Sequence, residues 1–217
     1  MKKALFLAVI LLFYLQPACQ AMDCEQFIEG FGCYQVKKGD TLWKIAPPEY
    51  WTLIKKVNRI DERHLPQNKG ILIPLNIEQA GKYLPVAKEI EKIKTSQRAI
   101  FFFLKEQYFG AYEYGQLIYW GAISSGKNDS TPAGLFKVQW KAIAYHSKKY
   151  DAPMPFAVNF SETGYFFHQQ SLPGRPASHG CVRLTMEDAK TLFYWSQKKR
   201  CCHYRIITNK PPPRRGR

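Results

Sequence analysis

The sequence lacks a hydrophobic run long enough to cross a membrane, because its longest one covers only Ala4–Leu15. A membrane-spanning helix needs about twenty apolar residues. Basic residues precede this run and small residues follow it, which is the pattern of a secretory signal over residues 1–21. The sequence therefore predicts a periplasmic protein with no stable membrane span, cleaved after Ala21 or, alternatively, after Ala18.

Acidic residues are scarce: 17 Asp and Glu stand against 32 Lys and Arg, which gives a formal net charge of +15. On an intracellular protein this excess would first indicate nucleic-acid binding. Export makes nucleic acid an unsuitable partner and favours a polyanionic cell wall or an anionic membrane surface. The charge bears on encounter and retention rather than on the fold.

Cysteine is also rare, with six positions in 217 residues. Removal of the signal would leave an odd number, so we expect one free thiol in an oxidising compartment. Cys24 and Cys33 can form a local disulfide, and a link from this segment to Cys201–Cys202 is equally open. His179 and Cys181 are two residues apart, but no second pair of Cys and His follows at the spacing of a zinc site, so the sequence predicts neither a metal nor an organic cofactor.

The most informative segment is Ser178–Leu184, which reads Ser-His-Gly-Cys-Val-Arg-Leu. A thiolate is a strong nucleophile, and a nearby imidazole such as His168 or His179 can take up the proton of the Cys181 thiol. Gly180 lets the backbone approach a substrate and direct N–H groups at a developing oxyanion. The pattern predicts nucleophilic catalysis; the alternative is that Cys181 is a small buried core residue.

This segment resembles the catalytic motif of the bacterial L,D-transpeptidases, cysteine enzymes that remodel peptidoglycan. The resemblance covers residues 97–208, and further matching segments are Ile123–Lys127, Thr131–Phe136 and Met154–Pro155. It implies an α+β fold whose catalytic domain is mainly β, sandwich-like, with one C-terminal helix. It also implies that carbapenems acylate the cysteine.

The resemblance further implies the roles of the site residues. Cys181 would attack the carbonyl of the third residue of a tetrapeptide stem, release D-alanine and form a thioester, which an amine of another stem resolves as a 3→3 cross-link. His168 would be the general base, oriented by the carbonyl of Gln169, and the N–H groups of Gly180 and Cys181 would form the oxyanion hole. Water or a lipoprotein amine are alternative acceptors, and a non-catalytic wall-binding protein is an alternative of another class.

The other candidates near the motif each have two interpretations. His179 assists the thiolate or supports the loop, in which Ser178 is expected to form hydrogen bonds. Arg183 binds a substrate carboxylate or forms a structural pair. Tyr150 and Met154 lie where the family lines its substrate pocket, but either can equally belong to the core.

Residues 33–75 show a strand, helix, helix, strand pattern and resemble a lysin motif (LysM), a module that binds glycans containing N-acetylglucosamine. The turn over Lys38–Asp40 is expected to lead into a helix capped by Asp40 or Thr41. The candidate glycan-binding residues are Gly39, Asp40, Thr41 and Leu42. The alternative is a small packing domain without a ligand.

The remaining segments complete the expected organisation. Residues 76–96 are expected to be a linker with a short helix after Pro85, and residues 209–217 a disordered tail. A helix capped by Thr185 is expected near the end of the catalytic domain. The expected strands are Ile100–Leu104, Gly115–Ala122, Leu135–Lys141, Ala157–Phe160, Gly164–Phe167 and Arg205–Thr208.

Overall fold

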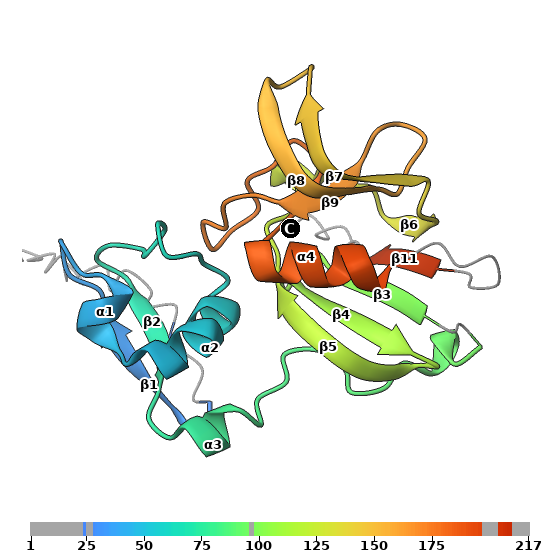
Figure 1. Cartoon of the computed structure of the whole chain (residues 1–217). Helices are drawn as coiled ribbons and strands as arrows, with labels where there is room; N and C mark the ends of the chain where they lie inside the picture. Colours follow the sequence, from blue (N-terminus) through green and yellow to red (C-terminus); the bar gives the residue numbers. More distant parts are fainter. Residues whose placement is uncertain (1–23, 25–27, 96–97, 197–203, 210–217) are drawn as a thin grey trace, which may run out of the picture.

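The computed structural model describes residues 24, 28–95 and 98–196, and the backbone of 204–209. The expected signal over 1–21, the pair Cys201–Cys202 and the expected tail beyond residue 209 lie outside the described residues. Figure 1 shows two units, a small N-terminal one in blue to teal and a larger one in green to red. None of the described helices has the length and apolarity of a membrane span.

The N-terminal unit has the βααβ order that the sequence predicts. Its elements are β1 (Phe31–Gln35), α1 (Leu42–Ile45), α2 (Pro48–Asn58) and β2 (Gly70–Pro74). β1 and β2 pair antiparallel, and the core between them and the helices contains Val36, Leu42, Ile54 and Ile71. Proline begins α2 because the first helical position needs no N–H donor.

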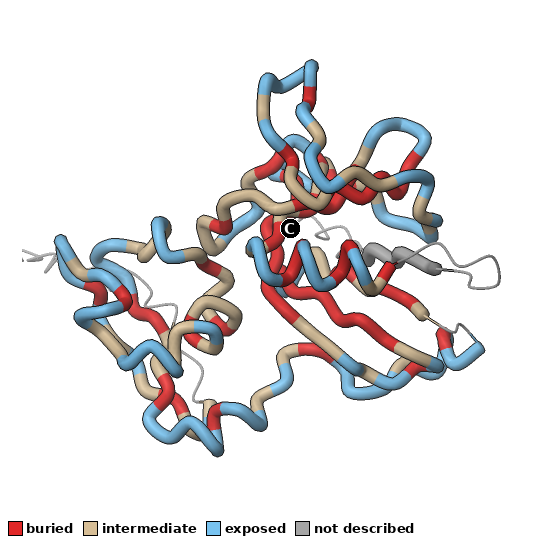
Figure 2. Tube along the Cα trace, viewed as in Figure 1, coloured by how far each residue is buried: buried red, intermediate tan, exposed pale blue. Residues whose placement is uncertain are grey.

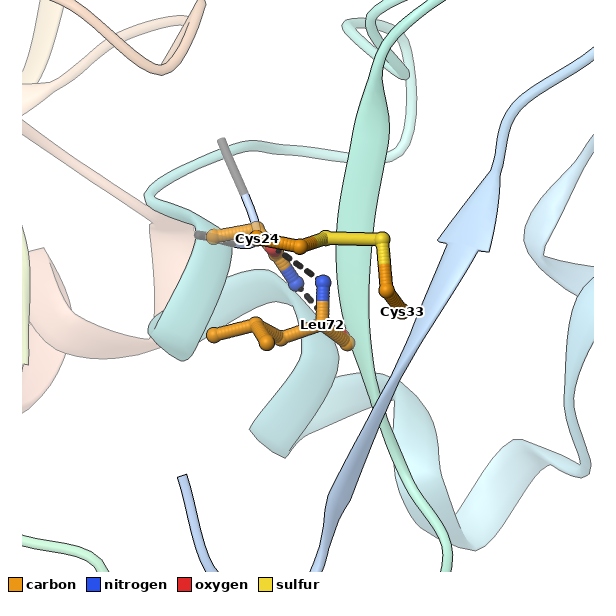
Figure 3. The surroundings of a disulfide bond; sticks show 4 residues. Cys24, Cys33 and Leu72 are labelled. Atoms are coloured by element: carbon orange, nitrogen blue, oxygen red, sulfur yellow. Dashed lines mark hydrogen bonds between the residues drawn. A yellow bond between two sulfur atoms is a disulfide. The ribbon is translucent and has the colours of Figure 1, made fainter. Parts of the chain in front are cut away.

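A disulfide between Cys24 and Cys33 ties the segment before β1 to that strand, with the Cα atoms 5.8 Å apart. Figure 3 shows it next to Leu72, which pairs with Cys33 across the sheet. The Asn58 amide accepts from Leu72 N and donates to Leu72 O, both at 2.8 Å, and so joins the end of α2 to β2. Of the two pairings that the sequence leaves open, the local bridge is the one formed.

The expected side-chain cap of α1 is wrong. Thr41 occupies the N-cap position without a side-chain hydrogen bond. Asp40 instead closes the preceding turn, because its carboxylate accepts from Lys37 N at 2.7 Å and from Tyr34 Oη at 3.1 Å. Short polar side chains compete in this way between capping a helix and bonding to a local turn.

The expected helix after Pro85 is also wrong. The short helix α3 (Ile77–Ala80) lies earlier, and a single 3₁₀ turn (Glu91–Ile93) follows later. Between them the chain runs along the larger unit, where Leu117 N donates to Lys88 O and Ile90 N donates to Gly115 O, each at 2.9 Å. The backbone groups at the edge of this sheet form hydrogen bonds with the connector. These bonds stabilise an extended connector more than its apolar spacing favours a helix.

The larger unit consists of two sheets and one long helix, so the predicted mainly-β α+β fold is confirmed (Figure 1). One sheet has the order β5-β4-β3-β11-β6 and the other β10-β9-β8-β7. The strands of the first are β3 (Arg98–Phe103), β4 (Tyr108–Glu113), β5 (Gln116–Ala122), β6 (Gly134–Phe136) and β11 (Tyr204–Asn209). Those of the second are β7 (Trp140–Ser147), β8 (Ala152–Asn159), β9 (Phe166–Gln169) and β10 (Val182–Leu184).

One hydrophobic cluster joins both sheets to the helix α4 (Met186–Trp195). It includes Phe102 of β3, Phe109 of β4, Phe167 of β9 and Leu192 of α4, all fully buried. Figure 2 marks the buried stretches of β3, β4, β9 and α4 in red. The expected cap of α4 is confirmed, since Thr185 Oγ1 accepts from Asp188 N at 3.1 Å.

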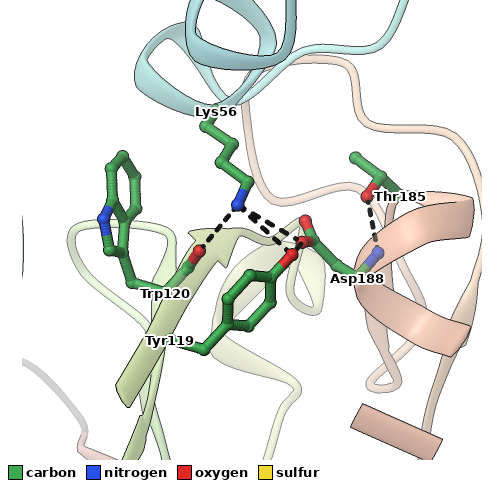
Figure 4. A network of polar contacts seen from close by, with 5 residues as sticks. All are labelled: Lys56, Tyr119, Trp120, Thr185 and Asp188. Atoms are coloured by element: carbon green, nitrogen blue, oxygen red, sulfur yellow. Dashed lines mark hydrogen bonds and ion pairs between the residues drawn. The ribbon is translucent and has the colours of Figure 1, made fainter. Parts of the chain in front are cut away.

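The two units are joined by a polar network around Lys56 of α2, which Figure 4 shows. Its ammonium lies 3.1 Å from the carbonyl of Trp120, 3.2 Å from Tyr119 Oη and 3.8 Å from Asp188 Oδ1. Asp188 is fully buried, and burial raises the pKa of its carboxyl, while Lys56 and the Tyr119 hydroxyl act in the opposite direction. The sequence places Asp188 only in the first turn of α4; the structure makes it part of the domain contact.

Candidate active site

Two adjacent parallel strands bring the candidate catalytic residues together. In the register of β9 and β10, His168 lies opposite Arg183, and Cys181 directly precedes β10. Cys181, His168 and Arg183 line one cavity of about 700 Å³, which is within the usual range of ligand pockets. The same cavity is lined by four further predicted residues: Ser178, His179, Tyr150 and Met154.

His168 is buried and has a fixed orientation. Its Nδ1 lies 2.8 Å from the carbonyl oxygen of Gln169, the orienting group that the sequence predicts. A carbonyl can only accept, so Nδ1 carries the proton and Nε2 is left as the basic nitrogen. Burial lowers the pKa of His168 to about 4; the Gln169 bond opposes this shift and the charge of Arg183 adds to it. The imidazole is therefore neutral at pH 7, as a general base must be.

Cys181 is a half-buried free thiol that packs against Met154, Ala157 and Phe166. Burial raises its pKa, although a backbone hydrogen bond from Phe166 and the charge of Arg183 act in the opposite direction. Burial thus disfavours the charged form of both the thiol and the imidazole. The thiol and the imidazole are therefore both in their neutral forms at pH 7.

Glycine is required at position 180 for two reasons. Its φ of +134° is strained for any other residue, and a Cβ there would lie 2.4 Å from Tyr165 Cε1. Its N–H donates to Ser178 Oγ at 2.9 Å, and the Ser178 hydroxyl donates to the carbonyl of Cys181. The expected loop role of Ser178 agrees with these bonds. The expected oxyanion role of the Gly180 N–H is wrong for this conformation, because a side chain already occupies that donor.

The loop before Cys181 is held by residues to which sequence reasoning assigned no role. Ala177 N and Ser178 N both donate to Ser125 O, at 2.9 and 3.0 Å. Thr131 Oγ1 donates to the carbonyl of Gly180 at 2.9 Å and accepts from Gly126 N at 2.7 Å. The segments Ile123–Lys127 and Thr131–Phe136 belonged to the family resemblance, which was the only signal for these contacts.

His179 and Tyr150 lie together at the exposed side of the cavity. Their rings are stacked, with centroids 4.8 Å apart and planes inclined by 7°. Tyr150 comes from the turn between β7 and β8, so the stack joins this hairpin to the catalytic loop. The contact favours the supporting interpretation of His179. Met154, by contrast, is 5% exposed and belongs to the apolar cluster beside the sulfur.

Arg183 is half-buried, and its backbone is fixed by two hydrogen bonds with Ser124. No ion pair joins its guanidinium to a carboxylate among the residues that the structure describes. Because its side chain lines the cavity, this arrangement favours the interpretation that Arg183 binds a substrate carboxylate.

The candidate glycan-binding residues follow one another from the first turn of the N-terminal unit into α1. Gly39 has a φ of +82° and open space around its Cα, so it is suited to a turn at the surface. Leu42 is 3% exposed and packs in the core, so its predicted contact with a glycan is wrong. Sequence reasoning missed Trp43, which is 74% exposed and packs edge-on against Trp51. The sequence could have indicated Trp43 as a glycan-binding candidate, because it is an aromatic residue close to the predicted turn.

A metal site was not predicted, and across residues 24, 28–95 and 98–196 no three His, Cys, Asp or Glu side chains form a group that could hold an ion. A half-buried thiol, an oriented imidazole and a guanidinium thus line one cavity of a unit built from two sheets, and this unit follows a small βααβ unit.

Comparison of the sequence with known proteins identifies the family to which the chain belongs. A model described as the L,D-transpeptidase catalytic domain matches residues 97–206, and a LysM domain model matches residues 34–47. YciB of Bacillus subtilis strain 168, named as a candidate L,D-transpeptidase, is 32% identical over 128 residues. That alignment covers 50% of this chain and 66% of YciB, slightly less than two thirds of the relative. The chain belongs to the L,D-transpeptidase family and carries a LysM segment.

One of the matching solved structures supports the fold. The L,D-transpeptidase from Xylanimonas cellulosilytica superposes with a TM-score of 0.53 and 22% identity, covering 73% of this chain and 78% of that one. The L,D-transpeptidase from Stackebrandtia nassauensis gives a TM-score of 0.49 and 22% identity over 62% and 63% of the two chains.

Proposed function

We propose that this protein is a peptidoglycan L,D-transpeptidase with Cys181 as its nucleophile. One observation carries the proposal: the thiol lies in the same cavity as a neutral imidazole, that of His168, whose basic Nε2 is set by the bond to Gln169. The cationic Arg183 in this cavity suits the carboxylates of a stem peptide.

The first half-reaction acylates the enzyme. As Cys181 Sγ bonds to the carbonyl carbon of the third stem residue, its proton passes to His168 Nε2. The bond from that carbon to the terminal D-alanine then breaks, and His168 returns the proton to the leaving amine. The Cys181 N–H is the proposed donor to the oxyanion, and such a donor is typically worth about 3 kcal/mol.

The second half-reaction transfers the acyl group. An amine of another stem attacks the thioester carbon, His168 Nε2 takes the amine proton, and the departing sulfur regains a proton. The product is a 3→3 cross-link. Water in place of the amine gives an L,D-carboxypeptidase, and a lipoprotein amine gives attachment of that protein to the wall.

The location and the partners follow from the same proposal. Residues 1–21 would direct export, and the protein would act in the periplasm on stem peptides and glycan strands. The LysM unit would hold the glycan at the Gly39–Thr41 turn, next to the exposed Trp43. The excess of Lys and Arg over Asp and Glu favours retention on an anionic wall.

Incubation with purified disaccharide-tetrapeptide, followed by mass spectrometry of the products, tests the proposal. We expect a 3→3 dimer from the wild type, none from Cys181→Ala, and at least a hundredfold slower formation by His168→Ala. Lys137→Gln, in which an exposed residue that lines neither of the two cavities is replaced, is the control and should remain active.

Three outcomes would contradict parts of the proposal. A dimer from Cys181→Ala would refute the nucleophile. Tripeptide alone would identify water as the acceptor. If the wild-type protein forms no product and gains no mass with a carbapenem, the remaining interpretation is a wall-binding protein without catalytic activity.

A further inference from the structure

A second cavity, of about 710 Å³, lies between the two units. α2 and the loop after it form one wall, while residues 169–171 and the start of α4 form the other. We propose that this interdomain cavity binds a second stem peptide, the one that supplies the amine for the acyl transfer. The proposal rests on the proposed function and adds a substrate site formed jointly by both units.

The interdomain cavity adjoins the catalytic one. Gln170 lines both cavities. Gln169, whose carbonyl orients His168, lines the interdomain cavity. Gln170 is held in place because its N–H donates to Leu184 O at 3.1 Å and its Oε1 accepts from Ser171 N at 3.0 Å. The two cavities therefore meet at Gln170.

The walls of the interdomain cavity are fixed to each other. Asp61 and Leu172 exchange two hydrogen bonds, Ile60 pairs with Pro173 in an antiparallel bridge, and Gly174 N donates to Arg59 O at 3.0 Å. The Lys56 network joins α2 to β5 and α4 in the same contact (Figure 4). The space between the units is thus a built feature of the fold and not a gap between loosely tethered domains.

The charges of the interdomain cavity suit a peptide that carries both carboxylates and an amine. Arg63 from the LysM unit and Lys190 from α4 supply exposed cations, and Glu187 supplies an exposed carboxylate. Within the part of the chain that the structure describes, no ion pair neutralises these three side chains. The described residues of the lining include no aromatic ring, so the cavity suits a charged peptide better than the face of an uncharged sugar.

Titration of the full-length Cys181→Ala protein with a free stem tetrapeptide, followed by the amide signals in NMR spectra, tests the proposal. We expect two groups of shifting signals, one around His179 and one around Arg63, Ser171 and Lys190. In Arg63→Glu/Lys190→Glu, the midpoint of the second group should rise at least fivefold, while that of the first changes less than twofold. Lys92→Glu/Lys137→Glu, two exposed charge reversals outside both cavities, is the matched control.

The outcomes separate this inference from the proposed function. No second group of shifts, or equal midpoints in the test and control variants, would overturn it. Shifts at Arg63 and Lys190 with an uncharged disaccharide but not with the tetrapeptide would overturn it in favour of a glycan site. Acylation of Cys181 by a carbapenem, measured by intact mass in Arg63→Glu/Lys190→Glu, reports on the proposed function alone and should equal that of the wild type.

Discussion

Asp61 and Leu172 exchange two hydrogen bonds across the contact between the units: Asp61 N donates to Leu172 O at 3.0 Å, and Leu172 N donates to Asp61 Oδ2 at 2.8 Å. Asp61 follows α2 of the LysM unit, whereas Leu172 lies between His168 and Cys181. The N-terminal unit therefore holds the segment that connects the proposed base to the proposed nucleophile.

Replacement of Asp61 should slow catalysis from outside the catalytic cavity. Asp61→Ala removes a charge-assisted hydrogen bond worth about 2 kcal/mol, which should free the 170–174 segment and lower the rate of Cys181 acylation by a carbapenem about tenfold. Glu62→Ala, which removes the neighbouring carboxylate and its exposed pair with Lys55, is the control. Equal rates for the two variants, measured by stopped-flow absorbance, would refute a positioning role for Asp61.

The pH dependence of acylation should reflect the neutral resting pair. Because burial lowers the pKa of His168 to about 4, the base stays unprotonated over a wide range. We expect the acidic limb of the rate of acylation to have its midpoint near pH 4. A midpoint near 6.5, the ordinary value for histidine, would show that the ring is more hydrated than in this structure.

The same shift should make folding stability depend on pH. Between pH 6.5 and 4 the unfolded chain binds a proton at His168 that the folded protein does not, so the free energy of unfolding falls as the pH is lowered. The lowered pKa corresponds to a loss of roughly 3 kcal/mol over that window. Denaturant unfolding of the wild type and His168→Gln at several pH values measures it, and identical slopes for both proteins would contradict it.

Gly180→Ala should impair both stability and activity. The new Cβ meets strained backbone and the Tyr165 ring 2.4 Å away, so a cost of about 3 kcal/mol or more is expected. Gly39→Ala is the matched control, because Gly39 also has a positive φ but no atom within 4 Å of the added Cβ. It should cost only about 1 kcal/mol. Thermal unfolding and carbapenem labelling compare the two, and equal losses would show that the Tyr165 contact is unimportant.

The elements that sequence predicted correctly have local causes. The βααβ order of the LysM unit follows from apolar spacing and a proline at the start of α2, and the Thr185 cap of α4 bonds to a group three residues away. The neighbourhood of Cys181, His168 and Arg183 was implied by a motif whose residues lie on adjacent strands. In each case short-range chemistry or a family pattern was enough.

The sequence-based predictions are wrong where the local structure depends on a partner far away in the sequence. The strands β4 and β10 were missed, since Gly110 interrupts one pattern and the other is a three-residue parallel pairing with β9. The connector around Lys88 follows a sheet edge instead of forming a helix. The Gly180 N–H is occupied by a hydroxyl that sequence spacing alone did not assign.

By itself the sequence indicated the family, the two-part organisation and part of the secondary structure, because these depend on residue identity and on neighbours within a few positions. Only the tertiary structure decided the protonation state of the reacting pair, because burial sets it, and the contact between the units, because Lys56 and Asp61 meet partners more than sixty residues away. Desolvation and long-range hydrogen bonds exist only once the chain has folded, and they convert the motif into a site.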